Sequence, residues 1–191
     1  MMNDLYIFVN PLVPFSNEIE HLLTFCQSSL STPVRLQVIP LVNLQVIQQF
    51  IQTNQLNDNL ATRNHLLSKA YQIALDYKAA QLQGKRYARE FLRLVQADSQ
   101  NYNQELAGQL FAQTGGDCEV FAEDRKAPLC KQLFEQDQHL ACDMKVEKVD
   151  TIVWYCNQFD EQTSYIIEGK ENIWQFPTLL NHLEIRELNH S

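Results

Sequence analysis

The most constraining feature of this sequence is a block of roughly a hundred residues with helical patterning, which separates two groups of β-type segments. The first group comprises residues 5–9 and 34–39, and the second comprises residues 151–156 and 163–168. Between residues 42 and 145 no segment alternates in the way that is typical of a strand. A chain of 191 residues fits one substantial domain, or a core domain that carries an insertion.

The amino-terminal β-type segments flank a predicted helix. Residues 5–9 form a continuous apolar run, which is typical of a strand buried on both faces, whereas residues 34–39 alternate. Helical periodicity begins after Ser16, which can cap the helix, as can Asn17; Asn17 and Glu20 approximate a capping box. The apolar face follows i, i+3, i+4, i+7 spacing: Ile19, Leu22, Leu23 and Cys26. The order β-α-β favours a right-handed crossover and a parallel strand pair.

The helical block contains recognisable helix boundaries. Gly84 and the pair Gly115-Gly116 are expected to end helices, and a further helix is expected to follow Pro128. After the block, residues 151–156 and 163–168 flank a polar turn and predict an antiparallel hairpin. A final helix is expected to begin at Pro177, with three leucines facing the core: Leu179, Leu180 and Leu183.

Composition and charge narrow the class of partner. The net charge of −8 argues against a general nucleic-acid binder, which needs a surplus of Lys and Arg. No run approaches the roughly 18 apolar residues of a membrane span, and Asp4 and Asn10 interrupt the first apolar run, so no secretory signal is expected. We therefore expect a cytoplasmic protein that binds neither membrane nor nucleic acid.

Cysteine and histidine usage indicates neither a metal site nor a disulfide framework. The five cysteines are odd in number and form no CxxC pair, so free thiols in a reducing compartment are expected. Cys26 and Cys156 are predicted to be core residues. The five histidines are scattered, and His21 is interpreted as a surface residue. No motif indicates a cofactor.

One cluster of basic residues contrasts with the negative net charge of the chain. The cluster comprises five cations, Lys78, Lys85, Arg86, Arg89 and Arg93, in a short span that holds only Glu90 as a counter-charge. Arg86, Arg89 and Arg93 follow the i, i+3, i+7 spacing of one helix face. Two interpretations remain open. The cluster is either a solvated helix face or a docking face for an acidic partner segment.

The stretch FVNPLVPFSNE, residues 8–18, joins the first strand to the first helix through a turn interrupted by proline. It resembles the strand–turn–helix of DsbA-like thioredoxin-fold proteins, in which the turn carries a Cys-Pro-x-Cys motif. Pro14 matches the motif proline, Val13 its first cysteine and Ser16 its second, with Phe15 between them. The NPL lead-in and the cytoplasmic context are most similar to the YjbH/SpxH group of Gram-positive bacteria.

The resemblance implies an α/β thioredoxin fold, β-α-β followed by β-β-α, with a large all-helical insertion. On this interpretation residues 1–42 and 146–191 form a thioredoxin-like domain with a four-stranded mixed sheet. Residues 43–145 form the inserted helical domain. The family's cis-proline loop corresponds to Val149, Asp150 and Thr151, which include no proline, so a trans bond is expected.

The residues in the turn exclude dithiol chemistry at this position. The family's reaction needs a thiolate that the helix amino terminus stabilises, and Val13 cannot ionise. Ser16 cannot resolve a disulfide. In glutathione-dependent relatives, the kappa-class transferases and chromene-carboxylate isomerases, the working serine occupies the first motif position, which here is Val13. Ser16 is open to two interpretations, a helix cap or a thiolate ligand.

Three functional hypotheses follow. The first is a redox-inactive adaptor without a cofactor that delivers an Spx-type regulator to the ClpXP protease, as the resemblance implies, so that Spx or ClpX is the expected partner. The second is a thiol-disulfide oxidoreductase or glutathione-dependent isomerase whose working group lies outside the turn. The third is a binding protein whose partner is unrelated to proteolysis.

Overall fold

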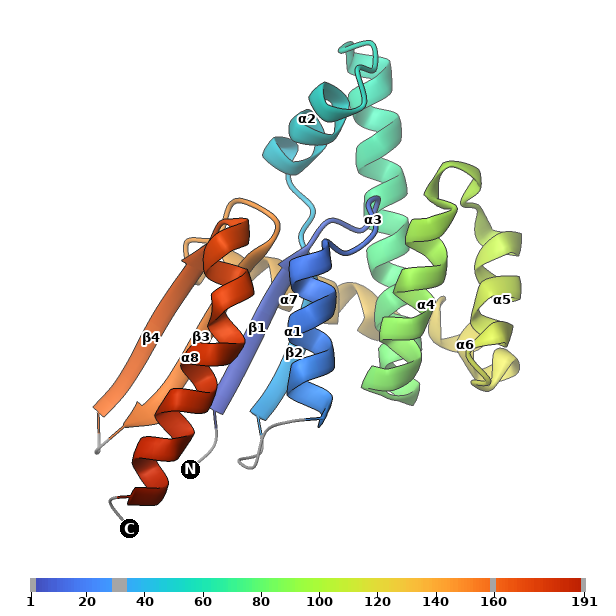
Figure 1. Cartoon of the computed structure of the whole chain (residues 1–191). Coiled ribbons are helices and arrows are strands. Elements are labelled where there is room, and N and C mark those ends of the chain that lie inside the picture. The colour runs from blue at the N-terminus through green and yellow to red at the C-terminus, as the bar shows by residue number, and fades with distance from the viewer. Residues whose placement is uncertain (1–2, 29–33, 159–160, 190–191) are drawn as a thin grey trace. The chain divides into compact units, whose positions relative to one another are not determined.

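The computed structural model describes residues 3–28, 34–158 and 161–189, and side chains within 4–26, 34–155 and 164–180. Its contacts divide the chain into two compact units, whose elements are labelled in Figure 1. The sheet unit comprises residues 1–9, 15–39 and 149–191. The helical unit comprises residues 10–14 and 40–148. The turn that precedes the first helix is therefore divided, and its residues 10–14 group with the helices.

The sheet unit contains one four-stranded sheet, as the sequence predicts, and its strand order is β2-β1-β3-β4. Strand β1 pairs antiparallel with β3, which pairs antiparallel with β4. Helices α1 and α8 pack against each other (Figure 1). The elements are β1 (Asn3–Val9), α1 (Asn17–Ser28), β2 (Val34–Pro40), β3 (Thr151–Gln158), β4 (Glu161–Glu168) and α8 (Lys170–Asn189).

Strand register explains the core of the sheet unit. Leu5 lies opposite Trp154, so their side chains share one face of the sheet. Trp154 stacks on Tyr165 with ring centroids 5.3 Å apart and meets Phe176 of α8 edge-on at 5.5 Å. The predicted apolar stripe of α1 is buried at three positions: Ile19, Leu22 and Leu23. Cys26 is half-buried, and the side chain of Cys156 lies outside the described residues.

The helical unit is arranged around its longest helix, α3, which packs against α2, α4, α6 and α7. Four of its helices begin at an Asn or Asp whose side chain accepts backbone N–H groups of the first turn. The elements are α2 (Leu44–Thr53), α3 (Leu60–Gln83), α4 (Lys85–Ala97), the 3-10 helix η1 (Ser99–Asn101), α5 (Gln104–Gln113), α6 (Cys118–Asp124) and α7 (Pro128–Asp143). Gly84 separates α3 from α4 with φ 140°, and Pro128 begins α7, as predicted.

Two predicted boundaries differ from the structure. The last helix begins at Lys170, after Gly169 with φ 88°, and contains Pro177 in its interior. The buried residues of this helix lie on both sides of the proline, at Ile173, Phe176 and Leu180, so packing outweighs the backbone hydrogen bond that proline removes. Leu179, predicted to face the core, is instead 54% exposed, because starting the helix at Lys170 turns a different face toward the sheet. The hairpin strands extend to Gln158 and Glu161, because ladder pairing depends on the backbone rather than on the polar side chains. Residues 159–160 of the predicted turn, and the Leu183 side chain, lie outside the described residues.

Within the described ranges, none of the helices combines the length and apolar character that crossing a bilayer requires. The same ranges hold no group of three or more His, Cys, Asp or Glu side chains arranged to ligate a metal ion.

Candidate partner-binding site

The lead-in to the turn folds on itself through Asn10. The Leu12 N–H donates to Asn10 Oδ1 at 2.8 Å, and the Val13 N–H donates to the Asn10 carbonyl oxygen at 3.4 Å. Asn side chains commonly replace a backbone acceptor in this way two residues along the chain. Asn10 and Leu12 are both buried, so the turn has a defined shape.

Two side chains of the helical unit hold this turn in place. The Gln96 side-chain amide of α4 donates to the Asn10 carbonyl oxygen at 2.8 Å. The Ser99 hydroxyl of η1 donates to the Leu12 carbonyl oxygen at 2.8 Å. We call residues 10–14 the anchored turn. Because both anchors bind backbone oxygens, the shape of the anchored turn does not depend on a cysteine at any motif position.

Gln96 and Ser99 are not among the site residues predicted from the sequence. One signal was present for Gln96, which follows Leu92 by four residues and Ala88 by eight and so continues the apolar stripe of α4. A polar residue on a buried stripe needs a hydrogen-bonding partner. Ser99 carries no comparable signal, because a serine after a helix is common in any connection.

The four motif positions fall in different units. Val13 and Pro14 are exposed and belong to the helical unit, with 38% of Val13 accessible. Phe15 and Ser16 are half-buried and belong to the sheet unit. Ser16 Oγ accepts the Ile19 N–H at 3.4 Å, so Ser16, rather than Asn17, caps α1. The serine thus has a structural role at the helix start.

The loop from Val149 to Thr151 has trans peptide bonds, as do the other described residues. Asp150 adopts a left-handed conformation with φ 53°, and its N–H donates to the Phe8 carbonyl oxygen at 2.9 Å. Thr151 is fully buried, and its hydroxyl has no hydrogen-bonding partner. Burial raises the pKa of the Asp150 carboxyl, as does the negative charge of Glu18, while Lys170 acts in the opposite direction.

Replacing Asp150 with asparagine is expected to stabilise the protein at neutral pH. The raised pKa means that the native state binds a proton more readily than the unfolded state, so this carboxylate lowers stability as the pH rises through its folded pKa. Asparagine removes the charge and tolerates the left-handed conformation. Thermal unfolding should give a higher Tm for Asp150→Asn at pH 7, with the difference vanishing in acid. A difference that is the same at both pH values would contradict the electrostatic cause.

Four of the five predicted cations lie on helix α4, whereas Lys78 is buried on α3. We call Lys85, Arg86, Arg89 and Arg93 the basic face. Lys85 and Arg86 are exposed, and Arg89 and Arg93 are half-exposed. Arg93 forms a long ion pair with Glu90 at 3.8 Å, an exposed contact that contributes little to stability.

The described cysteines lie outside the turn. Cys118 and Cys142 are exposed, and Cys130 is buried in α7. Burial, with a smaller effect of Asp124, raises the pKa of the Cys130 thiol to about 11, so it is protonated at neutral pH. His21, predicted to be a surface residue, is exposed on α1 and stacks on Trp174 at 4.5 Å.

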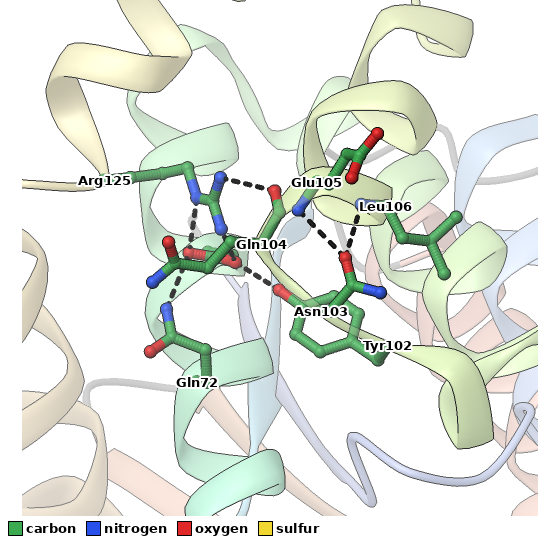
Figure 2. A network of polar contacts seen from close by, with 8 residues as sticks. Gln72, Tyr102, Asn103, Gln104, Glu105, Leu106 and Arg125 are labelled. Atoms are coloured by element: carbon green, nitrogen blue, oxygen red, sulfur yellow. Dashed lines mark hydrogen bonds and ion pairs between the residues drawn. The ribbon is translucent and has the colours of Figure 1, made fainter.

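A buried polar network lies within the helical unit (Figure 2). Arg125 donates to both carboxylate oxygens of Asp76, from Nε at 2.8 Å and from Nη2 at 2.7 Å. The Tyr102 hydroxyl also donates to this carboxylate, and Gln72 donates to it at 3.1 Å. Arg125 reaches the Gln104 carbonyl oxygen at 3.1 Å. Asp76 is completely inaccessible to solvent, so the network fastens helices together and offers no site for a substrate.

Comparison with known proteins identifies the family of the chain. The model of a thioredoxin family matches residues 6–176. The ClpXP adapter protein SpxH of Staphylococcus saprophyticus subsp. saprophyticus is 30% identical over 115 residues, which cover 58% of this chain and 44% of that relative. The match therefore spans less than half the length of this curated relative.

Solved structures agree with this assignment at the level of the fold. The oxidoreductase DsbA from Xylella fastidiosa superposes with a TM-score of 0.62 at 12% identity, covering 96% of this chain and 87% of that one. The cytosolic disulfide reductase DsbM from Pseudomonas aeruginosa gives 0.59 at 13% identity, covering 98% and 100%. The predicted thioredoxin fold with a helical insertion is confirmed. The chain therefore belongs to the thioredoxin family, with a DsbA-like fold and partial similarity to SpxH.

Proposed function

We propose that this chain is a redox-inactive adaptor that binds an Spx-type regulator and presents it to the ClpXP protease. The observation that carries the proposal is the anchored turn with Val13 at its exposed position. Hydrogen bonds from Gln96 and Ser99 maintain the turn where relatives with DsbA chemistry need a thiolate. A maintained surface without a nucleophile supports binding rather than catalysis.

The names of the relatives support an adaptor role in general. Matches from several staphylococci are named ClpXP adapter protein SpxH, which implies a protein partner for proteins of this type. The regulator and ClpX are the partners we assign to this chain, and the cytoplasmic location expected from the sequence is part of the same proposal. Neither a nucleic acid nor a membrane is required for this activity.

A reconstituted degradation assay tests the proposal directly. Purified ClpXP and the Spx-type regulator of the same organism are incubated with and without the chain, and the regulator is followed over time. We expect degradation to be faster when the chain is present and a binary complex to form without the protease. An unchanged degradation rate together with no binary complex would contradict the adaptor function.

The enzymatic alternative is tested in the same preparation. The chain is expected not to reduce insulin disulfides and not to bind glutathione saturably, because Val13 has no ionisable group and Ser16 caps α1. Turnover of a disulfide, or saturable glutathione binding that is lost on Ser16→Ala, would overturn the redox-inactive assignment and favour an oxidoreductase or glutathione-dependent isomerase.

A further inference from the structure

We propose that the outer edge of strand β4 is a site for strand addition, at which an extended, basic segment of a partner protein pairs with the sheet through its backbone. The strand lies at the end of the sheet order β2-β1-β3-β4, and β3 pairs with one of its sides (Figure 1). Among the described residues, no strand pairs with the other side. The inference goes beyond the proposed function, because it assigns a surface and a mode of binding that the adaptor role does not specify.

Strand β4 presents a long and regular row of unpaired backbone groups. Its eight residues pair with β3 in one unbroken register, from Thr151 opposite Glu168 to Gln158 opposite Glu161. Strands average about 5–6 residues, and this ladder contains no bulge. Because consecutive residues of a strand direct their N–H and C=O groups to opposite sides, about half of these groups point away from β3. An added strand therefore meets hydrogen-bonding partners that are already aligned.

The chain protects the opposite edge of the sheet but not this one. Natural edge strands are protected from pairing by charged side chains, prolines or bulges. Strand β2 contains Arg35, which forms an ion pair with Asp4 at 3.4 Å, and the strand ends at Pro40. Strand β4 has the sequence EQTSYIIE, which includes no proline, glycine or cation and carries its two charges at the ends. The centre of β4 is therefore open to pairing.

Apolar side chains are exposed on both faces of β4. Tyr165 is 45% exposed and Ile166 is 52% exposed, and consecutive side chains of a strand point to opposite faces. Tyr165 stacks on Trp154, which itself meets Phe176 of α8. The Tyr165 ring is therefore already ordered. An added strand with β-branched side chains covers apolar surface on each face of the sheet.

Charge complementarity selects a basic segment. Glu168 and Glu171 are exposed at the carboxy-terminal end of β4. Burial raises the pKa of Asp150, as does the negative charge of Glu18, and Lys170 opposes the rise, so both charged groups lie near the Asp150 carboxyl. Together these residues supply four carboxylates and one ammonium group. A basic residue on the flank of the added strand is favoured by this arrangement.

A second copy of the chain is a poorer occupant. Each copy carries a net charge of −8, so two copies repel each other. If two β4 strands paired antiparallel over their whole length, Glu161 of one copy would lie opposite Glu168 of the other. Like charges directly opposite one another destabilise a sheet. The acidic ends of β4 therefore favour a basic strand from another protein over self-association.

Peptide titration tests the site on the full chain. The probe is a fluorescein-labelled peptide of the same length as β4, which alternates valine and threonine between a lysine at each end. Fluorescence anisotropy should show saturable binding that weakens as salt rises. Binding should be lost in a counterpart with glutamate at both ends. It should also be lost when two adjacent central residues are N-methylated, because neither side of that peptide then has a complete set of backbone donors.

Two matched variants locate the binding. Ile166→Lys places a cation on the β4 edge, and Leu179→Lys places the same charge on α8 at a side chain of similar exposure, 54%. Both substitutions replace half-exposed side chains, so Tm should be unchanged in both. The affinity for the lysine peptide should fall by at least about tenfold in Ile166→Lys, because like charges then meet across the new strand pair. Leu179→Lys should retain wild-type affinity.

Hydrogen exchange identifies the strand that the peptide pairs with. In the free chain, the outward amides of residues 161–168 should exchange rapidly. The lysine peptide should slow this exchange and leave the exchange of α8 unchanged. No binding of the lysine peptide, or equal binding by both variants, would overturn the site.

Three further results would overturn parts of the inference. Equal binding of the N-methylated peptide would contradict pairing through the backbone, and equal binding of the glutamate peptide would contradict the preference for a basic segment. A dimer of the free chain in sedimentation, dissociated by Ile166→Lys, would assign the edge to a second copy. The adaptor function is tested separately by the degradation assay, so failure of the peptide to bind leaves that function intact.

Discussion

Replacing Asp76 with alanine is expected to destabilise the protein by about 3–5 kcal/mol, because it leaves a buried cation without its counter-charge. The carboxylate is completely buried and accepts hydrogen bonds from Arg125, Tyr102 and Gln72. Its loss leaves the Arg125 guanidinium and the Tyr102 hydroxyl without their acceptor. The network bridges α3, the connection before α5 and the end of α6, so most of the helical unit should be affected.

Urea unfolding followed by circular dichroism measures this loss. Tyr102→Phe removes one hydrogen bond to the same carboxylate. It should lower the free energy of unfolding by about 1.5–3 kcal/mol, which is less than the loss expected for Asp76→Ala. The matched control is Arg63→Ala, which breaks an exposed Arg–Asp pair of similar geometry, with distances of 2.6 and 2.8 Å to Asp58. Water solvates the Asp58 carboxylate when Arg63 is removed, so no measurable change in the midpoint of urea unfolding is expected. Equal effects at Asp76 and Arg63 would refute the role assigned to burial.

Replacing Lys78 with alanine is expected to lower the free energy of unfolding by about 3–5 kcal/mol, because the buried Asp137 carboxylate then lacks its cation. Lys78 is 5% exposed, forms an ion pair with Asp137 of α7 and donates to Gln81 at 2.9 Å. Burial raises the pKa of Asp137, while the charge of Lys78 opposes that rise. The Lys78–Asp137 ion pair therefore links α3 to α7, although removing both charged groups from water is unfavourable.

Two measurements test this explanation. Without Lys78 the pKa of Asp137 should rise further, so the native state binds a proton at a higher pH than the unfolded state. The stability loss in Lys78→Ala should therefore be largest at neutral pH and smaller in acid. The double variant Lys78→Met/Asp137→Leu should recover much of the loss, since apolar side chains replace both charges. A loss independent of pH, with no recovery in the double variant, would indicate a packing effect instead.

The Asp76 network and the Lys78–Asp137 ion pair both involve helix α3. Asp76 and Lys78 are buried on α3, and α3 packs against α4. Loss of either network should weaken partner binding only through the fraction of unfolded protein.

Local patterns were sufficient to predict much of the fold. The strands, α1 and the start of α7 followed from periodicity, capping residues and Pro128, which act over a few residues. The basic face followed from helical spacing in the same way. The start of α8 was misplaced because Pro177 is the strongest local start signal there, and packing across it is not a local property.

The order of elements, the helical insertion and the absence of a nucleophile at Val13 can be predicted from the sequence, since each depends on residue type or short-range spacing. The contacts that hold the turn are visible only in the folded structure. Gln96 and Ser99 reach it across 86 and 87 residues, and Arg125 reaches Asp76 across 49. Contacts at such separations depend on how helices pack, which residue spacing does not encode.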